Sequence, residues 1–259
     1  MSWFEALVLG IIQGLTEFFP VSSTGHLYLG RHFFGLDEAG LFLDTMLHLG
    51  TLIALLVFYR YEILAIIKKP FSKLTYLLVL GTIPAVIVGV LFKDFFEEIS
   101  KTGLTIGWEF LVTGLFLFYA DSCKKGFKKM DQIGYKDALF IGIFQAGAIF
   151  PAVSRSGLTI AAALIRKLDR ETAAYFSFLL STPAIFGAIL LQSVSLFKGT
   201  VEQISAISLI MAIIASGIFG YLAIKWMIGF LKRKSLKVFA VYVCCLGVIT
   251  LVGQLTGLM

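Results

Sequence analysis

Two polar segments inside an otherwise apolar sequence contain the side chains that could do chemistry. Residues 10–25 read GIIQGLTEFFPVSSTG and residues 142–157 read GIFQAGAIFPAVSRSG, so one motif is written twice at an offset of 132 residues. The first copy supplies the carboxylate of Glu17 and a run of hydroxyl groups, and the second supplies the guanidinium of Arg155. This combination suits phosphoryl transfer, in which a hydroxyl attacks, an acid or base moves the proton and cations hold the developing charge.

The first copy predicts a helix, a tight turn and a second helix. Gln13 and Glu17 are four residues apart and would share one helical face. Pro20 ends that helix because its ring cannot continue the hydrogen-bond ladder. The segment SSTGH at 22–26 then opens the next helix with hydroxyl side chains that can cap it. The unpaired N–H groups and the positive end of that helix would form a binding site for phosphate.

The second copy predicts the same arrangement with a cation added. Pro151 breaks the chain, and the segment SRSG at 154–157 starts a helix that has Thr159 one turn further on. Its first N–H groups would form a second anion site. Arg155 adds a planar fork of donors that matches pairs of phosphate oxygens.

Each of these residues also has a structural interpretation. Serine, threonine and glycine in membrane helices often serve only to pack helices together. Glu17 and Arg155 could form an ion pair with a purely structural role, and His26 could simply satisfy a backbone carbonyl. An ionisable side chain inside a bilayer costs at least about 2.5–3.5 kcal/mol, which favours a functional role for Glu17 and Arg155.

The composition is that of a membrane protein. Of its 259 residues, 58% are hydrophobic and only 15% are charged, against roughly 25% charged residues in soluble domains. The net charge of +6 does not indicate nucleic-acid binding, because the basic residues cluster between apolar segments.

The apolar segments predict an all-α integral membrane protein with six transmembrane helices and two re-entrant helical hairpins. A spanning helix needs about 20 apolar residues. Two other apolar regions, 3–35 and 137–165, are broken at the repeated motif and would enter the bilayer and return to the same side. The expected spans are residues 42–60, 74–92, 104–120, 172–195, 206–231 and 236–255.

The basic residues support this topology. Of the 22 lysines and arginines, 16 would lie on one side, in the regions 60–73, 124–136, 166–170 and 232–237. The side that bears them should be cytoplasmic. The first hairpin would then enter from outside and the second from the cytoplasm. We therefore expect one membrane domain over residues 1–259, made of inverted repeats at about 1–120 and 137–255, whose tips meet inside the bilayer at a site between the halves.

Other polar residues in the apolar segments are not expected to be catalytic. Asp44 and His48, four residues apart, could pair or line the cavity. Glu109 lies inside an expected span without an obvious partner. The acidic residues Asp94 and Glu98 are interpreted as part of an ordinary solvated loop.

The two motifs closely resemble those of a known family. QGLTEFFPVSSTGH at 13–26 together with PAVSRSGLT at 151–159 is similar to the undecaprenyl-diphosphate phosphatases of the bacitracin-resistance family, along essentially the whole chain. The resemblance implies a multi-pass hydrolase of the cell membrane that removes the terminal phosphate of a C55 polyprenyl diphosphate. The product is the lipid carrier of peptidoglycan synthesis. It also implies dependence on a divalent metal, Mg²⁺ or Ca²⁺, and competition with bacitracin for the lipid substrate, and it leaves open a homodimer.

The resemblance also implies roles for particular residues, with Ser23 as the nucleophile. His26, or a water activated by Glu17, stays open as an alternative. Gln13 stands where some members have Glu, and Ala152 where Gly is common. The implied catalytic residues are Glu17, Ser23, His26 and Arg155. The implied phosphate-binding residues are Ser22, Thr24, Gly25, Ser154, Ser156, Gly157 and Thr159. The implied metal ligands are Glu17 and Gln13.

A transporter is the alternative function. Inverted repeats with broken helices that meet at mid-bilayer are the architecture of secondary transporters. Arg155 and the helix ends could bind the headgroup of a polyprenyl phosphate and carry it across without chemistry. A phosphatase, unlike a carrier, needs Ser23 beside Glu17 and His26. For the phosphatase we expect the site to open to the extracytoplasmic side, with the prenyl tail leaving sideways into lipid.

Overall fold

The computed structural model describes residues 1–36, 41–123, 125–196 and 204–257, and within these ranges the chain is almost entirely helical. Lys124 and Lys198, which contribute to the charge comparison above, lie outside the described residues. A short 3₁₀ turn, η1, covers Met130–Gln132. The α-helices are α1 (Trp3–Phe18), α2 (Ser23–Phe33), α3 (Leu41–Phe58), α4 (Arg60–Lys68), α5 (Lys73–Leu91), α6 (Lys93–Thr102), α7 (Ile106–Ser122), α8 (Tyr135–Gly147), α9 (Arg155–Ile165), α10 (Arg170–Leu196), α11 (Ala206–Arg233) and α12 (Lys237–Leu255).

Four helices, α5, α10, α11 and α12, are long and apolar enough to cross a membrane. A fifth candidate is the pair Phe42–Phe58 and Arg60–Lys68, which bends by 76° at its break. The helix α7, expected as a span, has 17 residues. The expectation of a loop at Asp94 and Glu98 was wrong, because α6 forms there.

Polar and apolar side chains are distributed as a bilayer requires. Large apolar residues cover the outside of the long helices, for example Val86 and Ile87 on α5, which are 55% and 52% exposed. Polar side chains such as Gln13 and Gln145 are instead buried, at 0% and 2% exposed. The protein is therefore an all-helical, multi-pass membrane protein with its polar groups inside.

Both copies of the repeated motif fold as a broken pair of helices, as predicted. The first pair is α1 and α2, interrupted at residues 19–22, and the second is α8 and α9, interrupted at residues 148–154. The helices α2 and α9 both have 11 residues and begin at positions related by the repeat, Ser23 and Arg155. In each case a serine caps the second helix and a proline lies in the break. Pro20 follows the end of α1 at Phe18 by two residues, whereas α8 ends at Gly147, four residues before Pro151.

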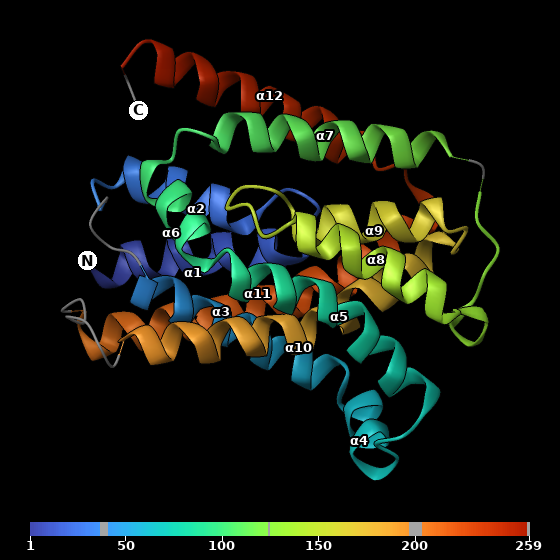
Figure 1. The fold of residues 1–259 in the computed structure, drawn as a ribbon. Coiled ribbons are helices and arrows are strands. Elements are labelled where there is room, and N and C mark those ends of the chain that lie inside the picture. Colours follow the sequence, from blue (N-terminus) through green and yellow to red (C-terminus); the bar gives the residue numbers. More distant parts are fainter. Residues whose placement is uncertain (37–40, 124, 197–203, 258–259) are drawn as a thin grey trace.

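The first helix of each pair packs closely against a long helix from the other half of the chain, α1 against α11 and α8 against α5 (Figure 1). Matched glycines make these approaches possible. A Cβ atom added to Gly10 would lie 2.6 Å from the Ala212 carbonyl oxygen. One added to Gly142 would lie 2.4 Å from the Gly81 carbonyl oxygen. The helices α7 and α12 also lie side by side, and α7 contacts α9. This packing brings the two breaks together.

Candidate active site

Glu17, near the end of α1, connects the two repeats. Its side chain is buried, with the residue 7% exposed. Its Oε2 atom accepts a hydrogen bond of 2.6 Å from the Ser23 hydroxyl, which begins α2. Its Oε1 atom forms an ion pair of 2.5 Å with Nη2 of Arg155, which begins α9. Three residues that the sequence predicted to act together, from both copies of the motif, therefore meet at one carboxylate.

Arg155 retains a donor that the ion pair does not use. Its Nη1 atom is buried and has no hydrogen-bond partner among the described residues. An unpaired buried donor of this kind is costly. A guanidinium binds phosphate oxygens in pairs, so Nη1 and Nη2 together fit an anion that enters beside Glu17.

Gln13 and His48 complete the surroundings of Glu17. The Gln13 side chain donates from Nε2 to Glu17 Oε2 over 3.0 Å, whereas its Oε1 is buried without a partner among the described residues. The Nε2 atom of His48, on α3, lies 3.6 Å from the same Glu17 oxygen. The carboxylate of Asp44 pairs instead with Arg31 at 2.5 Å, and His48 Nδ1 contacts the Asp44 backbone carbonyl at 2.7 Å.

The two helix starts are capped in the same way. The Ser22 hydroxyl accepts from the Gly25 amide at 3.3 Å, and the Ser154 hydroxyl accepts from the Gly157 amide at 3.0 Å. Each cap uses one of the orphan N–H groups of its helix and leaves the first ones for another acceptor. The caps differ in one respect: Ser22 has φ of 71°, a conformation that non-glycine residues rarely adopt.

Two side chains from α7 hold the second break in place. The Glu109 carboxylate accepts a hydrogen bond from the Ala152 amide, and the Thr113 hydroxyl accepts one of 3.0 Å from the Ser154 amide. Ser156 fixes this break to the first one, because its hydroxyl donates to the Phe19 carbonyl at 2.9 Å. These bonds fix the backbone on either side of Arg155.

His26 is directed toward other partners. Its Nδ1 contacts the Ser22 carbonyl at 2.7 Å, and its Nε2 contacts the Tyr242 hydroxyl on α12 at 2.8 Å. Because a carbonyl only accepts, Nδ1 carries the proton in the neutral ring, and the Nε2 lone pair accepts from Tyr242. The interpretation of His26 as a residue that satisfies a backbone carbonyl therefore describes one of its two contacts.

The remaining predicted residues lie at or near the breaks. Thr24 is part-exposed in the first turn of α2. Gly25 is required by space, since an added Cβ would lie 2.6 Å from the Phe110 ring and 3.1 Å from Ala152 Cβ. Thr159 is fully buried, and its hydroxyl bonds Ser177 and the Arg155 carbonyl, at 2.5 and 2.8 Å. Thr159 therefore fixes the start of α9 to α10.

From the sequence, Glu109 had no identifiable partner, and His48 was expected only to pair with Asp44 or to line the cavity. Both were visible as ionisable side chains in apolar segments, and such residues are functional candidates by default. Their partners could not be identified, because these depend on how α7 and α3 pack against the breaks.

The donor set around Glu17 can also be compared with a metal site. Among the described residues, no group of three His, Cys, Asp or Glu side chains is placed to hold an ion. The free Oε1 of Gln13 and the Glu17 carboxylate are nevertheless adjacent oxygen ligands of the type that Mg²⁺ and Ca²⁺ prefer. Such ions often take one or two protein ligands and complete their shell with phosphate oxygens and water.

The fold and the site define a class of protein: a helical membrane protein in which two capped helix starts and a buried Glu–Arg–Ser cluster lie together. The chain belongs to the family described as bacitracin resistance protein BacA, whose model matches residues 6–249.

Full-length relatives have consistent names. The chain is 68% identical over 256 residues to undecaprenyl-diphosphatase 3 of Bacillus cereus, covering 99% of both chains. It is 49% identical over 263 residues to the undecaprenyl-diphosphatase of Carboxydothermus hydrogenoformans, again with 99% of both chains. The similarity extends to an undecaprenyl-diphosphatase of Methanobrevibacter smithii, at 38% identity over 279 residues and the whole of both chains.

Proposed function

We propose that this protein is an undecaprenyl-diphosphate phosphatase, a membrane hydrolase that removes the terminal phosphate of a C55 polyprenyl diphosphate and so regenerates the lipid carrier for peptidoglycan synthesis. The observation that carries the proposal is the Glu17 carboxylate, with Ser23 on one oxygen and Arg155 on the other. Relatives of that name match the full chain.

The substrate diphosphate would bind between the two breaks. Arg155 offers its free Nη1 together with Nη2 to the terminal phosphate. The first N–H groups of α2 and α9 would surround the same group, with their helix dipoles favouring negative charge. The prenyl tail needs no enclosed pocket, because the bilayer solvates it.

Ser23 is the proposed nucleophile. Its Oγ attacks the terminal phosphorus while its proton passes to Glu17 Oε2, which is 2.6 Å away. The bond from that phosphorus to the bridging oxygen breaks, and polyprenyl phosphate leaves with the electron pair. In the second step Glu17 returns that proton to Oγ as water attacks the phosphoserine and the phosphorus–Oγ bond breaks. The carboxylate freed in this way takes a proton from the attacking water and releases it to solvent when inorganic phosphate leaves, so Ser23 and Glu17 end the cycle in their starting states.

The bonds of His26 favour Ser23 over His26 as the nucleophile. Both ring nitrogens of His26 are engaged, and its Nε2 lone pair would first have to leave Tyr242. The Ser23 hydroxyl, in contrast, is already bonded to the oxygen that would take its proton. We therefore assign His26 to orienting the start of α2 through the Ser22 carbonyl.

A divalent metal, Mg²⁺ or Ca²⁺, would be held by Glu17 and by the free Oε1 of Gln13. When bound, it would supply positive charge to the diphosphate oxygens. With Gln13 in place of a carboxylate, the protein contributes one negative ligand only, so the ion and the substrate should bind together. Bacitracin would compete with the enzyme because it would take up the same lipid diphosphate. A homodimer is compatible with this site, which one chain completes.

We also propose the finer topology: one plasma-membrane domain over residues 1–259 with six spans and two re-entrant hairpins, in inverted repeats at about 1–120 and 137–255. The crossed packing of α1 on α11 and of α8 on α5 supports it, since an inverted repeat requires such matched contacts. The basic regions would lie in the cytoplasm, and the site would open to the extracytoplasmic side.

Phosphate release from polyprenyl diphosphate tests the proposed function. Purified protein in detergent should release phosphate without any gradient, and a chelator should abolish the activity until Mg²⁺ or Ca²⁺ is restored. Ser23→Ala should reduce the rate by orders of magnitude, whereas Ser122→Ala, which removes an exposed hydroxyl at the end of α7, should not. Lipid transport by a protein that releases no phosphate would instead identify a carrier.

A further inference from the structure

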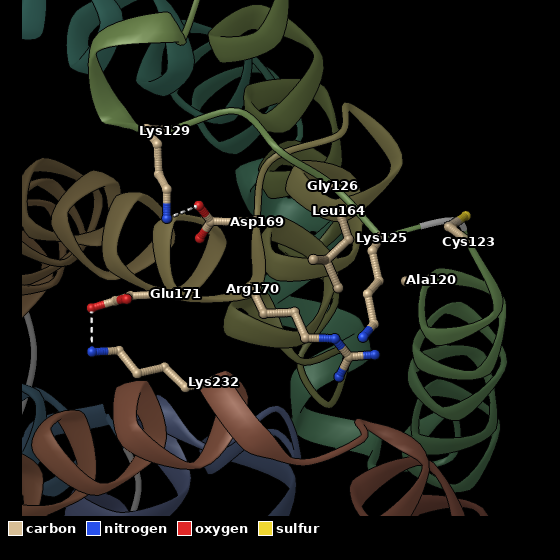
Figure 2. A pocket seen from close by; sticks show the side chains of 10 residues that line it. All are labelled: Ala120, Cys123, Lys125, Gly126, Lys129, Leu164, Asp169, Arg170, Glu171 and Lys232. Carbon is tan, nitrogen blue, oxygen red and sulfur yellow. Dashed lines mark ion pairs between the residues drawn. The ribbon is translucent and has the colours of Figure 1, made fainter.

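A pocket of about 280 Å³ lies where the ends of four helices meet, and none of the residues discussed above for catalysis lines it (Figure 2). The meeting helices are α7, α9 and α11, at their last residues, and α10, at its first. The residues that line the pocket are Ala120, Cys123, Lys125, Gly126, Lys129, Leu164, Asp169, Arg170, Glu171 and Lys232.

The lining has more positive than negative charge. Two of its four cations are neutralised inside the pocket: Lys129 pairs with Asp169 at 2.7 Å, and Lys232 pairs with Glu171 at 2.6 Å. Lys125 is exposed and has no acidic partner among the described residues. The pocket therefore retains a free ammonium group in addition to its ion pairs.

Arg170 adds directional donors next to that charge. Its Nη2 pairs with Asp121 at 2.5 Å and its Nη1 donates to the Lys234 carbonyl at 2.7 Å, so the guanidinium is fixed while part of its five N–H donors stays unused. Figure 2 shows the charged ends of Lys125 and Arg170 directed toward the same part of the pocket. The start of α10 adds no free donors, because the Asp169 carboxylate caps it by accepting a hydrogen bond of 2.9 Å from the Thr172 amide. The fixed guanidinium with unused donors and the free ammonium together form a receptor for a phosphate anion.

We propose that this pocket binds the phosphate of an anionic lipid headgroup. The cations lie at helix ends, and the ends of membrane-spanning helices lie at the depth of the lipid headgroups. A lipid headgroup is therefore favoured over a soluble anion as the occupant. In the proposed topology the pocket lies on the cytoplasmic side, where anionic leaflets face basic pockets between helices. The pocket would thereby anchor α7, α10 and α11 to the membrane surface at the side opposite to the entrance of the proposed active site.

Lipid binding to the full-length protein tests this inference. Native mass spectrometry of protein in mild detergent would count bound phosphatidylglycerol, with phosphatidylcholine as the neutral lipid. One lysine near an anionic surface contributes roughly a fivefold gain in binding, so Lys125→Glu should weaken the binding of phosphatidylglycerol at least that much. The matched control is Lys136→Glu, which reverses an exposed charge outside the pocket lining and should leave binding unchanged.

The results of these measurements distinguish an anionic lipid from free phosphate as the occupant of the pocket. Equal binding of the two lipids, or equal losses in the two variants, would overturn the inference. Inorganic phosphate should displace the lipid only at concentrations far above that of the lipid. Displacement at similar concentrations would identify free phosphate as the occupant and overturn the lipid assignment. Phosphate release from polyprenyl diphosphate should be unchanged by Lys125→Glu, so this inference and the proposed catalytic function fail independently.

Discussion

Glu17 shows why a buried carboxylate can be retained against its cost. One of its oxygens accepts from Ser23 and Gln13, and the other pairs with Arg155. Apolar residues of similar volume often replace a buried ion pair without loss of stability. Stability alone therefore gives little reason to keep this pair inside a membrane. Together with the free Nη1 of Arg155, the pair indicates a site prepared for a further anion.

The first prediction concerns the geometry of Arg155. Arg155→Lys keeps the charge but loses the planar fork, so one ammonium group cannot hold both Glu17 and a phosphate. We expect kcat/KM for polyprenyl diphosphate to fall by about 10²–10³, the effect of removing one transition-state donor, with little change in thermal stability. Steady-state kinetics and a melting curve would measure both. A lysine variant with near-normal kcat/KM would show that charge alone suffices and that the fork is not used.

The cluster could be predicted from the sequence because each copy of the repeat contains part of it. Two copies of one motif, each with a proline and a cap serine, predict two tips that meet, and Glu17, Ser23 and Arg155 do meet. The contacts of Glu109 with the second break and of His48 with Glu17 were not predictable. These contacts depend on how α7 and α3 pack against the two breaks, and no local sequence pattern specifies that packing.

At the scale of elements, glycine decides how closely the broken helices approach the long ones. Gly10 on α1 faces the Ala212 carbonyl and Gly142 on α8 faces the Gly81 carbonyl. The two positions are equivalent in the repeat, and both contacts are with backbone atoms, which cannot move aside as a side chain end can. The repeat therefore contains the glycines that allow close helix packing as well as the polar residues of the candidate active site.

The second prediction follows from that contact. Gly142→Ala would place a methyl group 2.4 Å from a carbonyl oxygen and should destabilise the protein by about 1–3 kcal/mol. Gly187→Ala is the matched control in α10, where an added Cβ meets nothing within 4 Å, and it should be neutral or slightly stabilising. Thermal unfolding in detergent would compare the two. Equal melting temperatures would mean that α8 and α5 can separate without cost.

The boundaries of the long helices followed from hydrophobic length, and their breaks followed from proline and cap residues. The span expected at 74–92 is α5, Lys73–Leu91, and that expected at 236–255 is α12, Lys237–Leu255. The helices α4 and α6 were not predicted. Both are short and lie at the ends of apolar helices, where composition does not separate a helix from a loop.

At the scale of the whole molecule, the third prediction tests the proposed topology. Ser100, on α6, and Ser122, at the end of α7, are both exposed and would lie on opposite sides of the membrane. In a variant without the three native cysteines, Ser100→Cys should react with a membrane-impermeant maleimide in intact cells. Ser122→Cys should react only after lysis. Labelling of both in intact cells, or the reverse pattern, would contradict the inverted arrangement.

The crossed packing also has a consequence for biosynthesis. The surface of α1 that contains Gly10 is completed by α11, whose contact residue Ala212 is made about 200 residues later. At about 5–20 residues per second, the ribosome needs about 10–40 s to supply it. During that interval the first hairpin enters the membrane with Glu17 lacking its cationic partner, since Arg155 is also still to come. The nascent chain therefore depends on lipid, or on the insertion machinery, to shelter a polar segment that the finished protein encloses by itself.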